Sequence, residues 1–154
     1  MPLVHDSFTL HRNFPHNRDR VFAALADPAL KQRWYADTTM EIQATEMDFR
    51  VGGIERQRYV LREGSPFPGV VLENEGRFED IVERERVVVS TSMQFGGKRI
   101  STSLLTFELD DDEGGGCALR FTHQAVFYEG ADGPEMRRGG WDSMLDALVR
   151  LLAS

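Results

Sequence analysis

The chain has 154 residues, with 18 Lys and Arg against 25 Asp and Glu, which gives a formal net charge of −7 at pH 7. Apolar residues make up 41% and charged residues 28%, the balance of an ordinary soluble globular protein rather than a disordered or fibrous one. This length suits one domain over residues 1–154 and is too short for two. The acidic balance argues against binding the nucleic-acid backbone, which needs clustered Lys and Arg.

Targeting and redox signals are also missing from the sequence. No run of 18 apolar residues occurs, which excludes a transmembrane helix. The start of the chain has no basic segment followed by an apolar run, so we expect no signal peptide and a cytoplasmic location. The single cysteine, Cys117, cannot form an intrachain disulfide, which excludes a disulfide-stapled scaffold.

The N-terminal part predicts one strand followed by two short helices. Residues 8–14 alternate between apolar and polar side chains, which indicates a half-buried strand. Asn17 is placed to cap a first helix. Asp27 is placed to cap a second helix that begins at Pro28 and runs to about Trp34, because a proline loses no hydrogen bond at the first helical position.

The long middle part of the chain, from about residue 38 to 128, has strand character. Glycine- and proline-rich turns divide it into short segments, which favours hairpins and therefore an antiparallel meander. The expected strands are residues 54–61, 73–82, 86–95, 99–109 and 118–128, with one or two more within 38–50.

The C-terminal segment predicts a long amphipathic helix. Asp132-Gly133-Pro134-Glu135 is a helix start signal. Apolar side chains then recur at helical spacing at Trp141, Met144, Leu145, Leu148, Leu151 and Leu152. This stripe must bury against the sheet, so the fold class is α+β, a curved antiparallel sheet wrapped around the C-terminal helix with the two short helices closing one end. A sheet that curls away from its helix leaves room for a ligand cavity.

Matching residues along nearly the whole chain resemble the START-like (SRPBCC, helix-grip) superfamily. Within it, the chain is similar to the C-terminal domain of the activator of the heat-shock-protein-90 ATPase. The matches are Arg12, Val21, Phe22, Leu25, Asp27, Pro28, Trp34, Asp48, Val51, Gly52, Gly53, Gly76, Leu105, Thr106, Phe107, Leu119 to His123, Gly140, Trp141, Leu145 and Leu148. Their order and spacing are specific for the fold rather than for a function.

The resemblance implies six or seven antiparallel strands that grip the terminal helix around an apolar pocket. Members of the superfamily bind lipids or other hydrophobic molecules, cyclise polyketides or stimulate a chaperone. Two positions depart from this branch. Arg137 stands where members often carry a histidine four residues before the tryptophan, so no role of that histidine is carried over, and Gly139 doubles the glycine at Gly140. The additional N-terminal domain of full-length chaperone activators is also not found, which weakens a co-chaperone interpretation.

Aromatic and apolar side chains supply the candidate ligand-binding residues. A tryptophan can cover a cavity and stack on a flat ligand, and an imidazole on an apolar face can hydrogen-bond to a ligand or act as an acid or base. The alternative is that the tryptophans are simple core residues and that His123 is structural. The expected pocket residues are Trp34, Tyr59, Phe78, Phe107, Phe121, His123, Trp141, Met144 and Leu145.

The segment 54–61 has two faces, neither of them cleanly apolar. One face carries Glu55, Gln57, Tyr59 and Leu61. If this face points inward it gives the cavity a polar wall, and Glu55 then needs a cationic partner, since a lone buried carboxylate would take up a proton. Arg12 is one candidate for that partner. The alternative is a solvated strand at the rim.

The pair Gly139-Gly140 lies inside a helical pattern, where each glycine costs about 1 kcal/mol relative to alanine. The pair therefore needs a reason. Close approach of another segment is one reason, and a kink or a late helix start after a loop over residues 132–138 is another. Room for a ligand is the third.

Other patterns give no catalytic or metal site. Residues 110–113 are acidic but lack the spacing of a calcium loop, so they indicate a solvated hairpin tip. The four histidines have no metal-ligand spacing. Cys117 and His123 would lie about 20 Å apart along one strand, which rejects a nucleophile pair. Phe67, between two prolines, is either part of a lid or a plain turn anchor. We expect no catalytic residue, metal or cofactor.

The leading hypothesis is therefore a binding protein for a small hydrophobic molecule, either a monomer or a homodimer. A second hypothesis is stimulation of a chaperone ATPase through an exposed patch, with no sizeable cavity. A third is a cyclase or lyase acting on a hydrophobic, polyketide-like substrate, with His123 or Tyr59 working together with Glu55. That enzyme requires the three side chains to converge on one point of a pocket.

Overall fold

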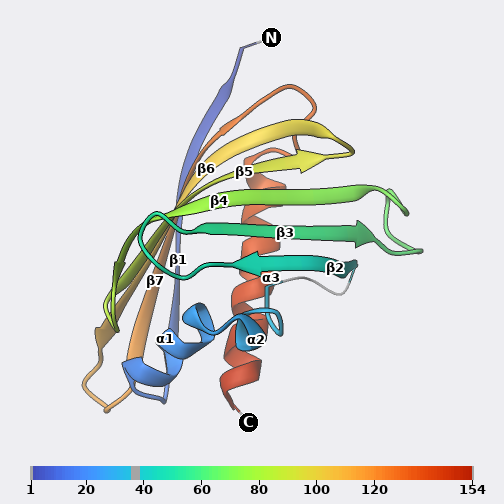
Figure 1. Cartoon of the computed structure of the whole chain (residues 1–154). Helices are drawn as coiled ribbons and strands as arrows, with labels where there is room; N and C mark the ends of the chain where they lie inside the picture. Colours follow the sequence, from blue (N-terminus) through green and yellow to red (C-terminus); the bar gives the residue numbers. More distant parts are fainter. Residues whose placement is uncertain (1, 36–38, 154) are drawn as a thin grey trace.

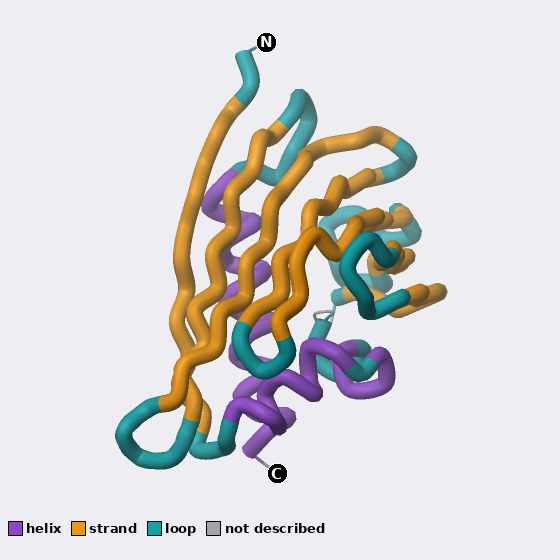
Figure 2. Tube along the Cα trace, turned by 60° about the vertical axis from the view of Figure 1, so that its left-hand side comes forward, coloured by secondary structure: helices purple, strands orange, loops and turns teal. Residues whose placement is uncertain are grey.

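The computed structural model of this protein describes residues 2–35 and 39–153. One antiparallel sheet of seven strands curves around a long C-terminal helix, and two short helices lie beside that helix at one end (Figures 1 and 2). The elements are β1 (Val4–Phe14), α1 (Arg18–Ala26), α2 (Pro28–Lys31), β2 (Met40–Met47), β3 (Ile54–Leu61), β4 (Val71–Val82), β5 (Arg86–Phe95), β6 (Lys98–Asp111), β7 (Cys117–Phe127) and α3 (Pro134–Ala153). The predicted helix-grip fold is confirmed.

The sheet is a meander whose last strand pairs with its first, in the order β1-β7-β6-β5-β4-β3-β2. Val4 lies opposite Phe127 and Phe14 lies opposite Cys117, so β1 and β7 pair over their whole length. The segment 38–50 supplies one strand, β2, at the far edge; position 38 lies outside the described residues. Both edges of the sheet therefore come from the N-terminal third of the chain.

The predicted caps of the two short helices are confirmed. The side chain of Asn17 accepts a hydrogen bond from the backbone of Arg20 at 3.3 Å, and Asp27 accepts one from Ala29 at 2.9 Å. Helix α2 ends at Lys31, three residues before the predicted end, and turns continue the chain to Trp34. Burial explains that early end, because the chain must turn there to place the Trp34 ring in the core, where its Nε1 donates to the Ala24 carbonyl at 2.9 Å.

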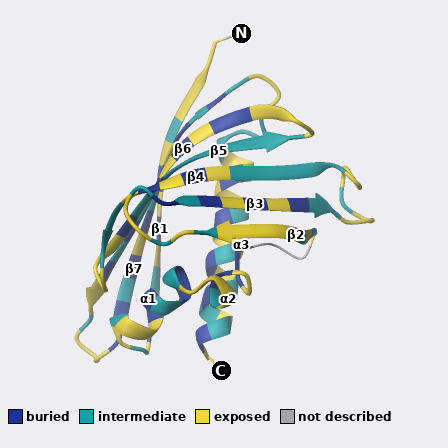
Figure 3. Cartoon of the chain, viewed as in Figure 1, coloured by how far each residue is buried: buried dark blue, intermediate teal, exposed yellow. Residues whose placement is uncertain are grey.

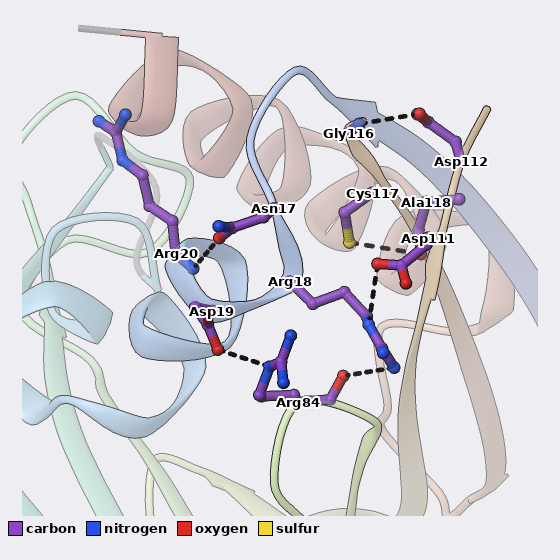
Figure 4. A network of polar contacts seen from close by, with 10 residues as sticks. All are labelled: Asn17, Arg18, Asp19, Arg20, Arg84, Asp111, Asp112, Gly116, Cys117 and Ala118. Atoms are coloured by element: carbon purple, nitrogen blue, oxygen red, sulfur yellow. Dashed lines mark hydrogen bonds and ion pairs between the residues drawn. The ribbon is translucent and has the colours of Figure 1, made fainter. Parts of the chain in front are cut away.

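Polar contacts fix α1 against the hairpin turns at the same end of the sheet (Figure 4). Arg18 donates to the carboxylate of Asp111 at 3.0 Å and to the backbone carbonyl of Arg84 at 3.3 Å. The guanidinium of Arg84 in turn pairs with Asp19. These exposed pairs add little stability, but they hold the short helix over the sheet end.

Buried and exposed residues alternate along the strands, as a sheet with one covered face requires (Figure 3). On β7 the residues from Cys117 to Phe127 are buried at every second position. On β3 the same alternation buries Glu55, Gln57 and Tyr59, so this polar face points inward and the rim-strand alternative is wrong.

Helix α3 packs its apolar stripe on the inner face of the sheet. Trp141, Leu145, Leu148 and Leu152 are at most 5% exposed, at spacings of four, three and four residues. The helix begins at Pro134 and includes both glycines, so a start after residue 138 is wrong. These four residues of α3 belong to one hydrophobic core together with buried residues of α1 and of the sheet.

Candidate functional site

A cavity of about 230 Å³ separates the first half of α3 from strands β2 to β6. Helix α3 contributes Met136, Arg137, Gly140, Trp141 and Met144 to its wall. The strands contribute an apolar surface made by Met40, Leu61, Leu72, Met93, Phe95 and Ile100. Met136 is 70% exposed, so the cavity reaches the protein surface beside this residue.

Gly140 forms part of the cavity wall without any packing need for a glycine. A Cβ atom added at Gly140 would have nothing within 4 Å, and the same is true of the exposed Gly139. Close approach of another segment is therefore excluded as the reason for either residue. Room for a ligand beside Gly140 stays a prediction.

Aromatic side chains close the inner side of the cavity. Trp141 lies 5.5 Å from the ring of Tyr35 and 4.3 Å from that of Phe121, centroid to centroid. The hydroxyl of Tyr59 donates to the backbone carbonyl of Tyr35 at 3.2 Å. Burial, with a further contribution from Glu55, raises the pKa of Tyr59 far above its usual range, so this phenol stays protonated. The aromatic wall is therefore neutral.

A buried ion pair joins α2 to β3 behind this wall. The ammonium of Lys31 bonds to the carboxylate of Glu55, and their side chains are 8% and 5% exposed. Lys31 Nζ also lies 4.5 Å from the centre of the Tyr35 ring. The prediction of Arg12 as a candidate partner for Glu55 is wrong, because Arg12 pairs with two carboxylates of α3, Asp142 and Asp146.

His123 is a buried imidazole next to the cavity. It is 1% exposed and stacks on Phe8, with ring centroids 4.7 Å apart. Burial, with a smaller contribution from the cation of Arg137, lowers the pKa of His123 to about 4, so the ring is neutral near pH 7. Its Nδ1 atom has no hydrogen-bond partner among the described residues, and Oδ1 of Asn74 is the other buried side-chain atom in that condition. Each such atom costs about 1–3 kcal/mol.

Arg137 occupies the position where the resemblance expects a histidine. Its guanidinium donates to both carboxylate oxygens of Asp132, at 2.9 and 2.8 Å, and to Ser101 at 2.9 Å. It also lies 5.0 Å from the ring centre of Phe127. This arginine is 6% exposed and its charge is balanced by Asp132, which makes it a fixed part of the cavity wall.

The nine expected pocket residues divide into two groups. Tyr59, Trp141 and Met144 line the cavity, and His123 lines a smaller hollow beside it. The other five side chains are fully or almost fully buried in the core and are not part of the cavity lining: Trp34, Phe78, Phe107, Phe121 and Leu145. A ligand-binding role for any of the nine stays a prediction.

Sequence reasoning missed most of the apolar strand lining. Leu72 and Asn74 share the strand parity of the buried Phe78, and Met93 shares that of the buried Val89. Parity could therefore have placed these side chains on the inner face.

The Phe67 ring is 56% exposed and lies 5.5 Å from that of Phe95, so it packs beside the cavity wall.

No group of three or more His, Cys, Asp or Glu side chains gathers as a metal site within residues 2–35 and 39–153. In the same ranges, no helix has the length and apolar content to cross a bilayer. Two smaller hollows share lining residues with the main cavity and have volumes of about 20 and 30 Å³. A larger open hollow of about 580 Å³ is lined mostly by polar and charged side chains, among them Arg56, Arg58 and Glu73. The cavity under α3 combines room with a mainly apolar lining, which makes it the candidate site for a small organic molecule.

A curved antiparallel sheet wrapped around a C-terminal helix defines the helix-grip class of folds. The chain belongs to the family described as Activator of Hsp90 ATPase homolog 1-like protein, whose model matches residues 15–153. No curated protein matches the chain. Membership in this family fits the binding of hydrophobic ligands in general.

Solved structures of similar proteins support the same assignment. A protein from Rhizobium loti is 36% identical, with a TM-score of 0.86, over 99% of this chain and 100% of that one. A protein from Rhizobium leguminosarum is 29% identical, with a TM-score of 0.89, over 99% and 97%. The AHSA1 protein from Silicibacter pomeroyi is 20% identical, with a TM-score of 0.74, over 96% and 98%, a likeness that shows the fold alone.

Proposed function

We propose that this protein binds a small hydrophobic molecule in the cavity between α3 and the sheet. The observation that carries the proposal is the glycine at position 140, which lines the cavity and has no packing neighbour within 4 Å of its missing side chain. The helix gives up about 1 kcal/mol of stability there and gains open apolar space in return. Family membership supports the same function, and a cytoplasmic location belongs to this proposal as a prediction.

The cavity volume limits the size of the ligand. An apolar cavity of about 150 Å³ admits benzene, whereas drug-sized ligands occupy about 300 Å³ or more. At about 230 Å³ the cavity fits a molecule of one or two rings. The driving force is the removal of the ligand's apolar surface from water, at about 25 cal/mol per Å², less the cost of ordering it.

The structure favours this function over the two alternatives. Stimulation of a heat-shock-protein ATPase was expected to come with no sizeable cavity, and only family membership supports it. A cyclase or lyase needs His123 or Tyr59 to work with Glu55. His123 lines a different hollow from Glu55, which counts against that pair. Tyr59 and Glu55 line one hollow, but it measures only about 20 Å³, and both groups are already engaged: Glu55 is bonded to Lys31, and Tyr59 donates to the Tyr35 carbonyl.

The test is a pair of matched helix variants, Gly140→Leu and Gly139→Leu. Both replace a glycine of α3 whose Cβ position is free of neighbours, so both keep or raise helix stability. Only Gly140→Leu places a side chain in the cavity. Binding of naphthalene is measured by equilibrium dialysis. We expect wild type and Gly139→Leu to bind it with equal affinity, and Gly140→Leu to bind it at least about tenfold more weakly. Equal affinity in all three proteins, or no binding to wild type, would contradict the proposal.

A further inference from the structure

A second, smaller hollow adjoins the ligand cavity at its inner end. It measures about 30 Å³, close to the volume of one water molecule. Five side chains line both spaces: Tyr35, Asn74, Met93, Arg137 and Trp141. The hollow is therefore a side chamber of the same cavity, with room for one oxygen atom and its hydrogens.

The chamber is lined by the two residues that carry the buried polar side-chain atoms without a hydrogen-bond partner in the described part of the chain. These atoms are Nδ1 of His123 and Oδ1 of Asn74. His123 is 99% buried and held in place by its stack on Phe8. Buried polar groups are normally hydrogen-bonded, so two unpartnered groups on residues that line one small hollow point to a bound group that satisfies both.

The charges around the chamber favour a neutral group. Arg137, the cation in its wall, is already neutralised by two hydrogen bonds to Asp132. A ligand anion would lie near the Asp132 carboxylate, which lines the main cavity, and a ligand cation would lie near Arg137. The imidazole and the amide are themselves uncharged near pH 7.

A hydroxyl group has the chemistry that the chamber requires. It donates one hydrogen bond and accepts others, so it can donate to Asn74 Oδ1 while it accepts from His123, in the tautomer that carries its proton on Nδ1. A C–H group can do neither. The apolar lining of the main cavity, including Leu72 and Ile100, takes the remainder of the molecule.

We propose that the ligand is a small amphipathic molecule, a body of one or two rings that carries a neutral hydroxyl group, with the ring body in the main cavity and the hydroxyl between His123 and Asn74. This inference rests on the proposed function and specifies the chemical class of the ligand. His123 then determines specificity because it hydrogen-bonds to the hydroxyl group of the ligand.

The test compares three probes that share one ring system: naphthalene, 2-naphthol and 2-naphthoate. The dissociation constant of each probe is measured by equilibrium dialysis at pH 7. We expect 2-naphthol to bind wild type at least about tenfold more tightly than naphthalene, and 2-naphthoate to bind more weakly than 2-naphthol. In His123→Phe, the ratio of the naphthalene to the 2-naphthol dissociation constant should fall to about one.

Two further variants keep this test decisive. His11→Phe makes the same replacement at an exposed position of β1 and should keep the wild-type ratio. Asn74→Leu leaves the imidazole in place and should also lower the ratio, which covers the case that His123→Phe fails to fold. If wild type binds both neutral probes equally, or prefers 2-naphthoate, the hydroxyl inference is overturned and the binding function stands. If wild type binds none of the probes, the proposed function itself fails.

Discussion

The buried imidazole of His123 makes the stability of the protein depend on pH in a way that one substitution removes. In the folded state its pKa is lowered to about 4, mainly by burial, whereas the unfolded chain has the usual value of about 6.5. Between these two values the unfolded state binds more protons, so stability is fully present above pH 6.5 and is lost as the pH falls toward 4. The loss reaches about 3 kcal/mol below both values and about 2 kcal/mol between pH 7 and pH 5.

The assay is urea unfolding of wild type, His123→Phe and His11→Phe at pH 7, 6 and 5. Other groups titrate in all three proteins, so the measured quantity is the difference between their free energies of unfolding. We expect wild type to lose about 2 kcal/mol more than His123→Phe between pH 7 and pH 5, and His11→Phe to behave as wild type. Parallel curves for wild type and His123→Phe would refute the account of this ring as a buried, neutral group.

Three further predictions concern other buried or helical positions. Lys31→Met leaves the Glu55 carboxylate buried without its partner and should lower the free energy of unfolding in urea by about 3–5 kcal/mol. The double variant Lys31→Met, Glu55→Gln should recover much of that loss, and no recovery would contradict the pairing. Gly139→Ala should stabilise by about 1 kcal/mol and raise Tm by about 2–4 °C, and a lower Tm would mean that the helix is interrupted there. Burial raises the pKa of Cys117 to about 11, so a thiol reagent at pH 8 should modify this cysteine only after unfolding, and rapid labelling of the native protein would contradict its burial.

The fold could be predicted from the sequence because its signals are local. Strand alternation on β3 and β7, the caps Asn17 and Asp27, and the apolar stripe of α3 each depend on residues a few positions apart. Chain order then leaves few ways to bury that stripe. The pairing of β1 with β7 joins strands from the two ends of the chain, and no local pattern predicts it.

The candidate site could be predicted only in outline, because a cavity is set by what side chains leave empty. Phe121 and Tyr59 both point to the inner face of the sheet by strand alternation, and Leu145 and Met144 both belong to the apolar stripe of α3. Phe121 and Leu145 are nevertheless packed in the core, whereas Tyr59 and Met144 line the cavity. No sequence pattern singles out Lys31 as a buried residue. Only the close approach of α2 to β3 reveals Lys31 as the partner of Glu55.

The methionines of this protein offer the most direct test of ligand binding under α3. Met40, Met93, Met136 and Met144 line the cavity, whereas Met47 lies on β2 outside its lining. In a protein labelled with ¹³C at the methionine methyl groups, titration with 2-naphthol should shift the NMR signals of the four cavity methionines and leave that of Met47 unchanged. Shifts confined to Met47, or no shift at any of the five, would contradict a ligand site between the helix and the sheet.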